Sequence, residues 1–392
     1  MESSALEGVG MKWAKGFVFI LGFISGVLEV VEATEFKIVR PGVAEAHDTF
    51  NEPWSVHVVR INRDHAEFRF LPSLGFRDRI GLNTLSEQIA LIPKSAGRVV
   101  AAINGDFYAT ENDPMPGDPR GLFVFEGQLV SSPIERDCFW MDTNGLPRIG
   151  MVRSLFTVRV GAEALDTFVL NADYDGSETV VCSTAATGAL RGDSRRGWIL
   201  SVDSSVWLPL KLGGVFTGVV LGRMEASVEG PTAQQLLLLP SASLAPAIKS
   251  GAKVRLSTAT NPSLLGVTTA LGGGPALLSG GQPTAMRAVK SRERHPRSAL
   301  GWNPSYWFLV VVDGRQPGLS VGMTLPELAG YFQGLGCTEA MNLDGGGSTE
   351  LLLGNRILNS PCYGHERQTA TSLMVVERAQ PKSATEQKTE RF

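Results

Sequence analysis

The sequence predicts a mixed α/β (α+β) fold, in which a mixed, twisted β-sheet with flanking helices forms a single elaborated domain. Alternating apolar and polar residues over 55–61 are typical of a half-exposed strand. Continuous apolar runs over 98–103 and 307–312 are typical of buried strands. Residues 83–91 and 324–335 have the polar start and apolar spacing of short helices.

The composition narrows the class of protein. The chain of 392 residues contains 44 Gly and 22 Pro, which indicates many turns and loops. Charged residues make up 19% and the net charge is −3, so no general charge argument favours nucleic acid as a partner. We expect one domain over residues 35–378. Within it, short strands separated by Gly, Asp and Ser make residues 151–257 a candidate inserted or variable subregion.

The N-terminal residues 1–33 have the features of a signal peptide. Lys12 and Lys15 precede an apolar run over 16–28, and small residues follow at the spacing that a signal peptidase prefers. Acidic residues before Met11 are unusual in such a segment, which makes Met11 an alternative start. An uncleaved anchor is the other alternative, although the run is short for a membrane span. We therefore expect a secreted, periplasmic or cell-envelope protein with no stable membrane span after cleavage.

Export affects what is expected of the cysteines. In an oxidising compartment, Cys138, Cys182, Cys337 and Cys362 permit one or two disulfides, but four free thiols fit the sequence equally well. Their spacing matches no metal-binding motif. Residues 379–392 are polar and charged without apolar periodicity, and a disordered tail is predicted there.

The strongest chemical signal is a carboxylate followed by three glycines. Asp344 precedes Gly345, Gly346 and Gly347, and Ser348 and Thr349 come directly after them. Glycine backbones can approach a ligand closely and expose their N–H groups, which suits an anionic or sugar-like ligand beside Asp344. A tight turn between strands is the alternative.

A second segment has a similar pattern. In both places a predicted helix leads into a strand that stops at Asn-x-Asp, first at Asn104 and Asp106, later at Asn342 and Asp344. Side chains at strand ends are held by the core and still face solvent. The two strand ends are therefore expected to deliver similar polar groups to one cleft.

Six sequence blocks together resemble a known family. In order they are N-G-D-F-Y at 104–108, G-G-G-P at 272–275, H-P-R-S-A-L-G at 295–301, D-G-R at 313–315 with S-V-G-M-T at 320–324, N-L-D-G-G-G-S at 342–348, and E-R at 366–367. Their order and spacing resemble the phosphodiester glycosidase family, which contains the lysosomal uncovering enzyme and bacterial exported proteins associated with exopolysaccharide. The likeness is good over 98–133 and 271–376 and poor between them, and the loop 359–365 does not match closely.

The resemblance implies hydrolysis of a carbohydrate phosphodiester, such as an N-acetylglucosamine-1-phosphodiester. A sugar 1-phosphate esterified to another alcohol would yield free sugar and a phosphomonoester. Cleaving the bond at the sugar's C1 needs a carboxylate that supports an oxocarbenium-like centre or activates water. A phosphate leaving group is a weak base, so it needs cations and N–H donors more than a general acid.

The inventory of polar residues fits this chemistry. We expect Asp344 to act as nucleophile or base, with Asp313 and Glu366 as further catalytic candidates, and Arg297 to be the main phosphate clamp. Substrate or phosphate binding is expected of Arg315, Arg367, His295, Asn104, Asp106, Asn342, Gly345, Gly346, Gly347, Ser348 and Thr349.

Each assignment has a structural alternative. Asp344 and Asp313 could start turns, Arg297 could pair with a structural carboxylate, and Glu366 with Arg367 could form an internal ion pair. Aromatic residues near these blocks are either a sugar-stacking platform or core: Phe107, Tyr108, Trp302, Tyr306 and Trp307.

No cofactor is required by the sequence. Oxygen ligands for Ca²⁺ or Mg²⁺ could come from Asp106, Asp313 and Asp344, but no ligand-spacing motif demands a metal.

Two other functions stay open. A non-catalytic envelope protein could bind carbohydrate or phosphate during exopolysaccharide or cell-wall processing, and a phosphodiesterase could cut the P–O bond instead.

Overall fold

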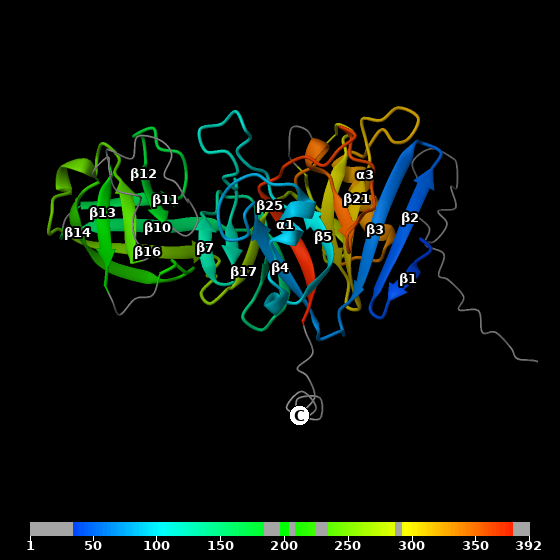
Figure 1. The fold of residues 1–392 in the computed structure, drawn as a ribbon, viewed down its shortest axis with the longest axis horizontal. Coiled ribbons are helices and arrows are strands. Elements are labelled where there is room, and N and C mark those ends of the chain that lie inside the picture. Colours follow the sequence, from blue (N-terminus) through cyan, green and yellow to red (C-terminus); the bar gives the residue numbers. More distant parts are fainter. Residues whose placement is uncertain are drawn as a thin grey trace, which may run out of the picture.

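The structure of the protein is a computed structural model, which describes residues 34–162, 164–183, 197–203, 208–224, 234–286 and 292–378. Its architecture is built almost entirely from strands, which form three open sheets and one closed barrel. Figure 1 shows the barrel at one end of an elongated molecule and the largest sheet at the other. The predicted signal peptide and the predicted tail lie outside the described residues.

The largest sheet has eight strands in the order β1-β2-β3-β21-β20-β22-β18-β19. All of its neighbouring strands pair antiparallel. The strands are β1 (Lys37–Arg40), β2 (Val43–Phe50), β3 (Trp54–Asn62), β21 (Tyr306–Val312), β20 (Arg297–Trp302), β22 (Glu339–Asn342), β18 (Ala276–Ser279) and β19 (Gln282–Pro283).

A five-stranded sheet packs against one face of the largest sheet. Its order is β24-β23-β5-β25-β4, from β24 (Arg356–Ile357), β23 (Leu351–Leu353), β5 (Arg98–Asn104), β25 (Thr371–Glu377) and β4 (Phe68–Leu74). Val59 and Leu309 from the first sheet and Ile103 and Met374 from the second belong to one buried cluster. This cluster is the apolar core of a two-sheet sandwich.

A third sheet and the barrel complete the chain. The sheet has the order β7-β6-β17-β8-β9, from β7 (Gln128–Ser131), β6 (Phe123–Phe125), β17 (Thr269–Gly272), β8 (Asp137–Met141) and β9 (Pro147–Met151). The barrel closes as β10-β11-β12-β15-β13-β14-β16, from β10 (Arg153–Val160), β11 (Ala164–Leu170), β12 (Thr179–Ser183), β15 (Gln235–Leu239), β13 (Trp198–Val202), β14 (Val215–Arg223) and β16 (Lys253–Asn261).

The predicted fold class is wrong. Strands dominate the described residues, whose only two α-helices are α1 (Leu85–Ala90) and α3 (Leu325–Gly334), beside the short 3-10 turns η1 (Lys94–Ala96), η3 (Ala245–Ala247) and η4 (Gly346–Ser348). The structure is therefore a multi-sheet β fold with a seven-stranded barrel and not an α/β sheet with flanking helices. The sequence does not reveal the barrel because its closure depends on pairing between strands far apart in the chain, such as β10 with β16.

The two helices form where the sequence predicts them, and their caps explain why. At α1 the Thr84 hydroxyl accepts from the Glu87 N–H and the Glu87 carboxylate accepts from the Thr84 N–H. At α3, Thr324 and Glu327 form the same reciprocal pair. This capping box satisfies N–H groups that the first helical turn leaves unpaired.

The barrel strands cover residues 153–261, close to the range 151–257 that the sequence sets apart. Their core is shared, since Leu129 and Trp140 of the third sheet belong to the same buried cluster as Phe156 and Leu200 of the barrel.

Two other features concern the cell-envelope prediction. Among the described residues no helix is long and apolar enough to span a membrane, and Cys138, Cys337 and Cys362 are free thiols.

We expect Phe332→Ala to lower the free energy of unfolding by about 3–5 kcal/mol, because it leaves a cavity in a fully buried site. Phe332 of α3 is 0% exposed and packs with Val310 and Leu278 on the outer face of the largest sheet. Urea denaturation measures the change. The control is Leu165→Ala on the barrel, where the side chain is 55% exposed and the expected change is within about 0.5 kcal/mol. A loss below about 1 kcal/mol for Phe332→Ala would contradict this packing.

Candidate active site

One end of the sandwich collects the polar residues that the sequence singled out. β5 ends at Asn104 and β22 ends at Asn342, while β20 and β23 begin at the same edge. The amide of Asn104 joins these strands. Its Oδ1 accepts from the Ser298 hydroxyl at 2.6 Å and from the Glu350 N–H at 3.1 Å, and its Nδ2 donates to the Asp344 carbonyl at 2.7 Å.

Asp344 is the half-buried carboxylate at this edge. Its N–H donates to the Gly105 carbonyl at 2.9 Å, which fixes its backbone beside the end of β5. Burial raises the pKa of Asp344 to about 6. Hydrogen bonds from the Ser348 side chain and the Gly345 N–H oppose the shift, as do the positive charges of Arg367 and Arg136.

Asp106 is the second acid of the site, but it is enclosed by protein. It is 2% exposed, and its carboxylate accepts from the Phe107 N–H at 2.8 Å and the Gly121 N–H at 2.7 Å. A Cβ on Gly272 would lie 2.2 Å from its Oδ2. Burial raises the pKa of Asp106 to about 7, against the nearby charge of Arg136. Asp106 therefore organises the surrounding loops and contributes charge, while Asp344 is the more exposed of the two acids.

Arg136 is the functional candidate that sequence reasoning missed. It directly precedes β8, and its positive charge acts on both Asp106 and Asp344. Its guanidinium lies over the Phe107 ring, 4.5 Å from the centroid. No motif contains Arg136, and the likeness to the family ends at residue 133. Only the close approach of its hairpin to the end of β5 reveals it.

Arg367 supplies a second cation to the same place. Its charge lowers the pKa of Asp344, and its guanidinium lies 5.7 Å from the centroid of the Tyr108 ring. The Tyr108 hydroxyl donates to the Gln368 carbonyl at 2.9 Å and lies 3.4 Å from the Ser348 hydroxyl. Asp344, Ser348, Tyr108, Arg136 and Arg367 thus form one connected cluster.

Arg297 has a different environment from the one expected of a phosphate clamp. It is 8% exposed, its Nε donates to the Met323 carbonyl at 2.8 Å, and its Nη2 donates to the Glu293 carbonyl at 2.7 Å. Burial lowers the pKa of Arg297 to about 10. The geometry favours a structural role, in which its guanidinium fixes two loops behind the glycines.

Asp313 lies beyond the end of β21, with β20 between it and the strand that carries Asp344. It is 1% exposed, and its Oδ2 accepts from the Ser55 hydroxyl at 2.8 Å and lies 3.1 Å from His57 Nε2. Its Oδ1 accepts from the Ser360 N–H at 2.8 Å. Both carboxylate oxygens of Asp313 therefore have partners in the protein, and one of them holds the segment that begins at Ser360.

Glu366 anchors the other end of that segment. Its Oε1 accepts from the Ser86 N–H at 3.1 Å and the Ser86 hydroxyl at 2.8 Å, at the start of α1. It also hydrogen-bonds to Glu350, whose carboxyl is 2% exposed. Burial raises the pKa of Glu350 to about 9, and the nearby Glu366 adds to this shift.

The other predicted residues line the glycine loop or support it. Arg315 Nη2 lies 3.4 Å from His295 Nδ1, and His295 Nε2 lies 2.9 Å from a Glu293 oxygen. A Cβ on Gly346, where φ is +63°, would lie 3.1 Å from Arg315 Nη2. The predicted backbone donors are partly used inside the protein: the Gly346 N–H donates to the Pro296 carbonyl at 2.9 Å, and the Gly345 N–H donates to Asp344.

Two predicted binding residues have internal partners. The Asn342 Nδ2 donates to the carbonyls of Gly274 at 3.0 Å and Leu343 at 2.7 Å. Thr349 is 3% exposed; its N–H donates to the Gly346 carbonyl at 3.3 Å, whereas its buried hydroxyl has no hydrogen-bond partner among the described residues. Of the aromatic candidates, Trp302 and Trp307 belong to the sandwich core.

The three acids proposed as metal ligands do not gather into a metal site. Within the described part of the chain, no group of three or more His, Cys, Asp or Glu side chains is placed to hold a metal ion. Both oxygens of Asp106 already accept backbone N–H groups, and Asp313 lies beyond a different strand from Asp344.

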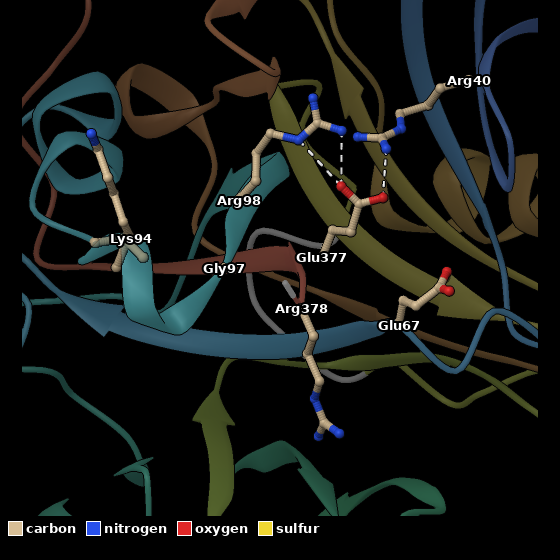
Figure 2. A pocket seen from close by; sticks show the side chains of 8 residues that line it. Arg40, Glu67, Lys94, Gly97, Arg98, Glu377 and Arg378 are labelled. Atoms are coloured by element: carbon tan, nitrogen blue, oxygen red, sulfur yellow. Dashed lines mark hydrogen bonds and ion pairs between the residues drawn. The ribbon is translucent and has the colours of Figure 1, made fainter. Parts of the chain in front are cut away.

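A cavity of about 590 Å³ opens at the opposite end of β5. Figure 2 shows Arg40 and Arg98 on the carboxylate of Glu377, with the Arg378 side chain directed away from them. Since β5 runs from Arg98 to Asn104, this cavity lies at the far end of the sheet from the candidate site.

A family model matches the later part of the chain. Residues 223–376 match the phosphodiester glycosidase family. This match covers the segment from the end of β14 to β25 and confirms the resemblance that the sequence motifs indicate. It includes Asp344 and Arg367 of the cluster, whereas Arg136 and Tyr108 lie before it. No curated protein is significantly similar to the chain in sequence.

Two solved structures are similar to this chain in fold. A hypothetical protein from Synechocystis has a TM-score of 0.70 and 19% identity, covering 89% of this chain and 64% of that one. The chain thus spans less than two thirds of that protein. A candidate exported protein from Burkholderia pseudomallei K96243 has a TM-score of 0.62 and 21% identity, covering 82% and 74%.

A third structure is less similar. The zebrafish N-acetylglucosamine-1-phosphodiester alpha-N-acetylglucosaminidase catalytic domain, auto-inhibited by its pro-peptide, has a TM-score of 0.46 and 13% identity, covering 88% of this chain and 87% of that one. This score is too low to bear on the fold.

We expect Glu350→Gln to reduce the loss of stability at alkaline pH. Because the folded pKa of Glu350 is about 9 against 4.5 for the free side chain, the native state binds more protons than the unfolded state between these values. Glu350 therefore makes stability fall as pH rises through this window, by up to about 1.4 kcal/mol per pH unit. Glutamine mimics the neutral acid and removes this contribution.

Urea denaturation at pH 5, 7 and 9 measures the effect. The difference in stability between variant and wild type should move in the variant's favour as the pH rises. Asp175→Asn, at an exposed acid on the loop before β12, is the control and should leave the pH dependence unchanged. Parallel pH profiles for wild type and Glu350→Gln would show that Glu350 is ionised in the native state.

Proposed function

We propose that this protein hydrolyses the glycosidic bond of a sugar 1-phosphodiester and releases a free sugar and a phosphomonoester. The observation that carries the proposal is Asp344, a partly buried acid beside a glycine loop, on which the positive charges of Arg136 and Arg367 both act. The family match over residues 223–376 supports the same reaction class.

Asp344 would act on the sugar's C1, as nucleophile or as the base that activates water. With a pKa of about 6, it is largely ionised at neutral pH, as either role requires. The Ser348 side chain and the Gly345 N–H hold the carboxylate by hydrogen bonds. These two donors limit the rotation of the carboxylate.

Arg136 and Arg367 would bind the phosphate. Guanidinium groups match phosphate oxygens with paired N–H donors, and they offset the charge that grows on the phosphate as the C1–O bond breaks. The phosphomonoester that leaves C1 is already a weak base, so the site needs little help from a general acid. This explains how a cluster with one accessible carboxylate and two arginines can suffice.

The same proposal places the enzyme outside the cytoplasm, on carbohydrate of the cell envelope or an exopolysaccharide. Its support is the N-terminal apolar run after Lys12 and Lys15, and the similar fold of a candidate exported protein.

We expect Asp344→Asn to lower the release of reducing sugar by about 10²–10⁴-fold, because the amide can neither attack C1 nor accept a proton. The assay incubates the purified protein with a sugar 1-phosphodiester and identifies the products. The control Asp175→Asn changes an exposed acid on the barrel side of the molecule and should keep wild-type rates.

The products separate the rival functions. Free sugar with a phosphomonoester supports the glycosidase, whereas sugar 1-phosphate would show cleavage of the P–O bond. Tight binding by wild type without any turnover would overturn the proposal in favour of a non-catalytic envelope protein that binds carbohydrate or phosphate.

We expect Arg136→Gln to lower kcat/KM by about 10–100-fold, since hydrogen bonds to charged groups contribute about 1.5–3 kcal/mol. Arg136→Lys should recover part of this loss, because it keeps the charge but loses the paired donors. The matched control is Arg148→Gln in the same hairpin, an exposed arginine paired with Asp142. Equal activity of Arg136→Gln and the control would exclude Arg136 from the phosphate site.

A further inference from the structure

Tyr363 is an exposed aromatic side chain placed directly on the glycine loop. It is 55% exposed, so more than half of its surface faces solvent. Its ring rests against Gly347: a Cβ at that glycine would lie 2.3 Å from Tyr363 Cε2 and 3.0 Å from Cζ. Gly347 precedes Ser348, whose side chain hydrogen-bonds to Asp344. One edge of the Tyr363 ring therefore packs on Gly347, next to Ser348, and much of the remaining side chain faces solvent.

The segment that carries Tyr363 is held at both ends. At its start, the Ser360 N–H donates to Asp313, and Gln316 exchanges hydrogen bonds with the Ser360 carbonyl at 2.8 Å and the Ser360 hydroxyl at 2.9 Å. At its end, Glu366 accepts from Ser86 at the start of α1. One anchor directly follows β21 of the largest sheet and the other lies at the start of α1, so the backbone is held on both sides of the ring.

A fixed, exposed aromatic ring beside a polar cluster suits a ligand with an apolar face. A pyranose ring has one, since its axial C–H groups form a patch that packs on an aromatic surface, while its hydroxyls remain available to polar groups. The His365 ring lies 6.4 Å from the Tyr363 ring at an interplanar angle of 31° and extends this surface. An acyclic alcohol offers no comparable face.

We propose that Tyr363 is the sugar-binding platform of the site and stacks on the pyranose ring of the substrate. This inference rests on the proposed function and adds a specificity: the site selects a cyclic sugar phosphate over the phosphate of an acyclic alcohol. Tyr363 would contact the sugar, while Arg136 and Arg367 would contact the phosphate. The selection would come from the loop 359–365, where the chain departs from the family pattern.

The first test is kinetic. Tyr363→Ala should raise the KM for a sugar 1-phosphodiester about tenfold and leave kcat within about twofold, because stacking is lost and the reacting groups remain. Tyr363→Phe should keep the wild-type KM, since it retains the ring. Leu165→Ala, which removes an equally exposed apolar side chain from the barrel, is the matched control. An unchanged KM in Tyr363→Ala overturns the inference and leaves the hydrolase proposal intact.

The second test is independent of turnover. Calorimetry should show that wild type binds glucose 1-phosphate about tenfold more tightly than glycerol 1-phosphate, and that Tyr363→Ala loses this preference while Tyr363→Phe keeps it. If wild type shows the preference but hydrolyses no diester, the proposed function fails and the platform stands. If wild type binds both phosphates equally, the platform is wrong whatever the hydrolysis assay shows.

Discussion

The amide of Asn104 is the constraint on which the geometry of the candidate site depends. One side chain accepts from the Ser298 hydroxyl and the Glu350 N–H and donates to the Asp344 carbonyl, so it joins strands of two sheets. An asparagine can do this because its carbonyl has two lone pairs and its NH₂ group is a donor. At 1% exposure, each partner left without its bond would cost about 1–3 kcal/mol. The hydrogen bonds of Asn104 between the two sheets thus fix the backbone of Asp344. The glycines that follow do not have to fix its position.

Burial and hydrogen bonding assign different roles to acids that look equivalent in sequence. Asp106 and Asp313 are almost fully buried and accept internal N–H or O–H groups, whereas Asp344 keeps partial exposure. Asp313 and Glu366, expected to be catalytic, hold the two ends of the segment that carries Tyr363, and Glu366 directly precedes Arg367. Their hydrogen bonds hold that segment in place. Since Asp344 also accepts two internal donors, what distinguishes it from Asp106 and Asp313 is its partial exposure.

The sequence predicted the local features well and the long-range ones poorly. Helix caps and strand ends depend on neighbouring residues, so the sequence predicts α1 and α3. The contact between Asn104 and Asp344 is long-range, but the similar Asn-x-Asp pattern at both strand ends indicated that they meet. Strand pairing is not local: β17 lies between β6 and β8, about 130 residues earlier, and β10 closes the barrel with β16. Arg136 was missed for the same reason, because its importance comes from which strand end its hairpin approaches.

The barrel lies away from the candidate site, but it affects the position of Arg136. The strand before this arginine is fastened to the barrel, since the Asn171 Nδ2 donates to the Val130 carbonyl at 2.8 Å and the Leu170 N–H donates to the Ser132 hydroxyl at 2.9 Å. A further bond joins the Leu129 N–H to the Leu210 carbonyl at 2.8 Å. Only three residues lie between Ser132 and Arg136, so the barrel constrains where that guanidinium can lie. The part of the chain least like the family thus contains Arg136, and a change in how the barrel docks would move the proposed phosphate site relative to Asp344 without a substitution at Asp344, Arg136 or Arg367.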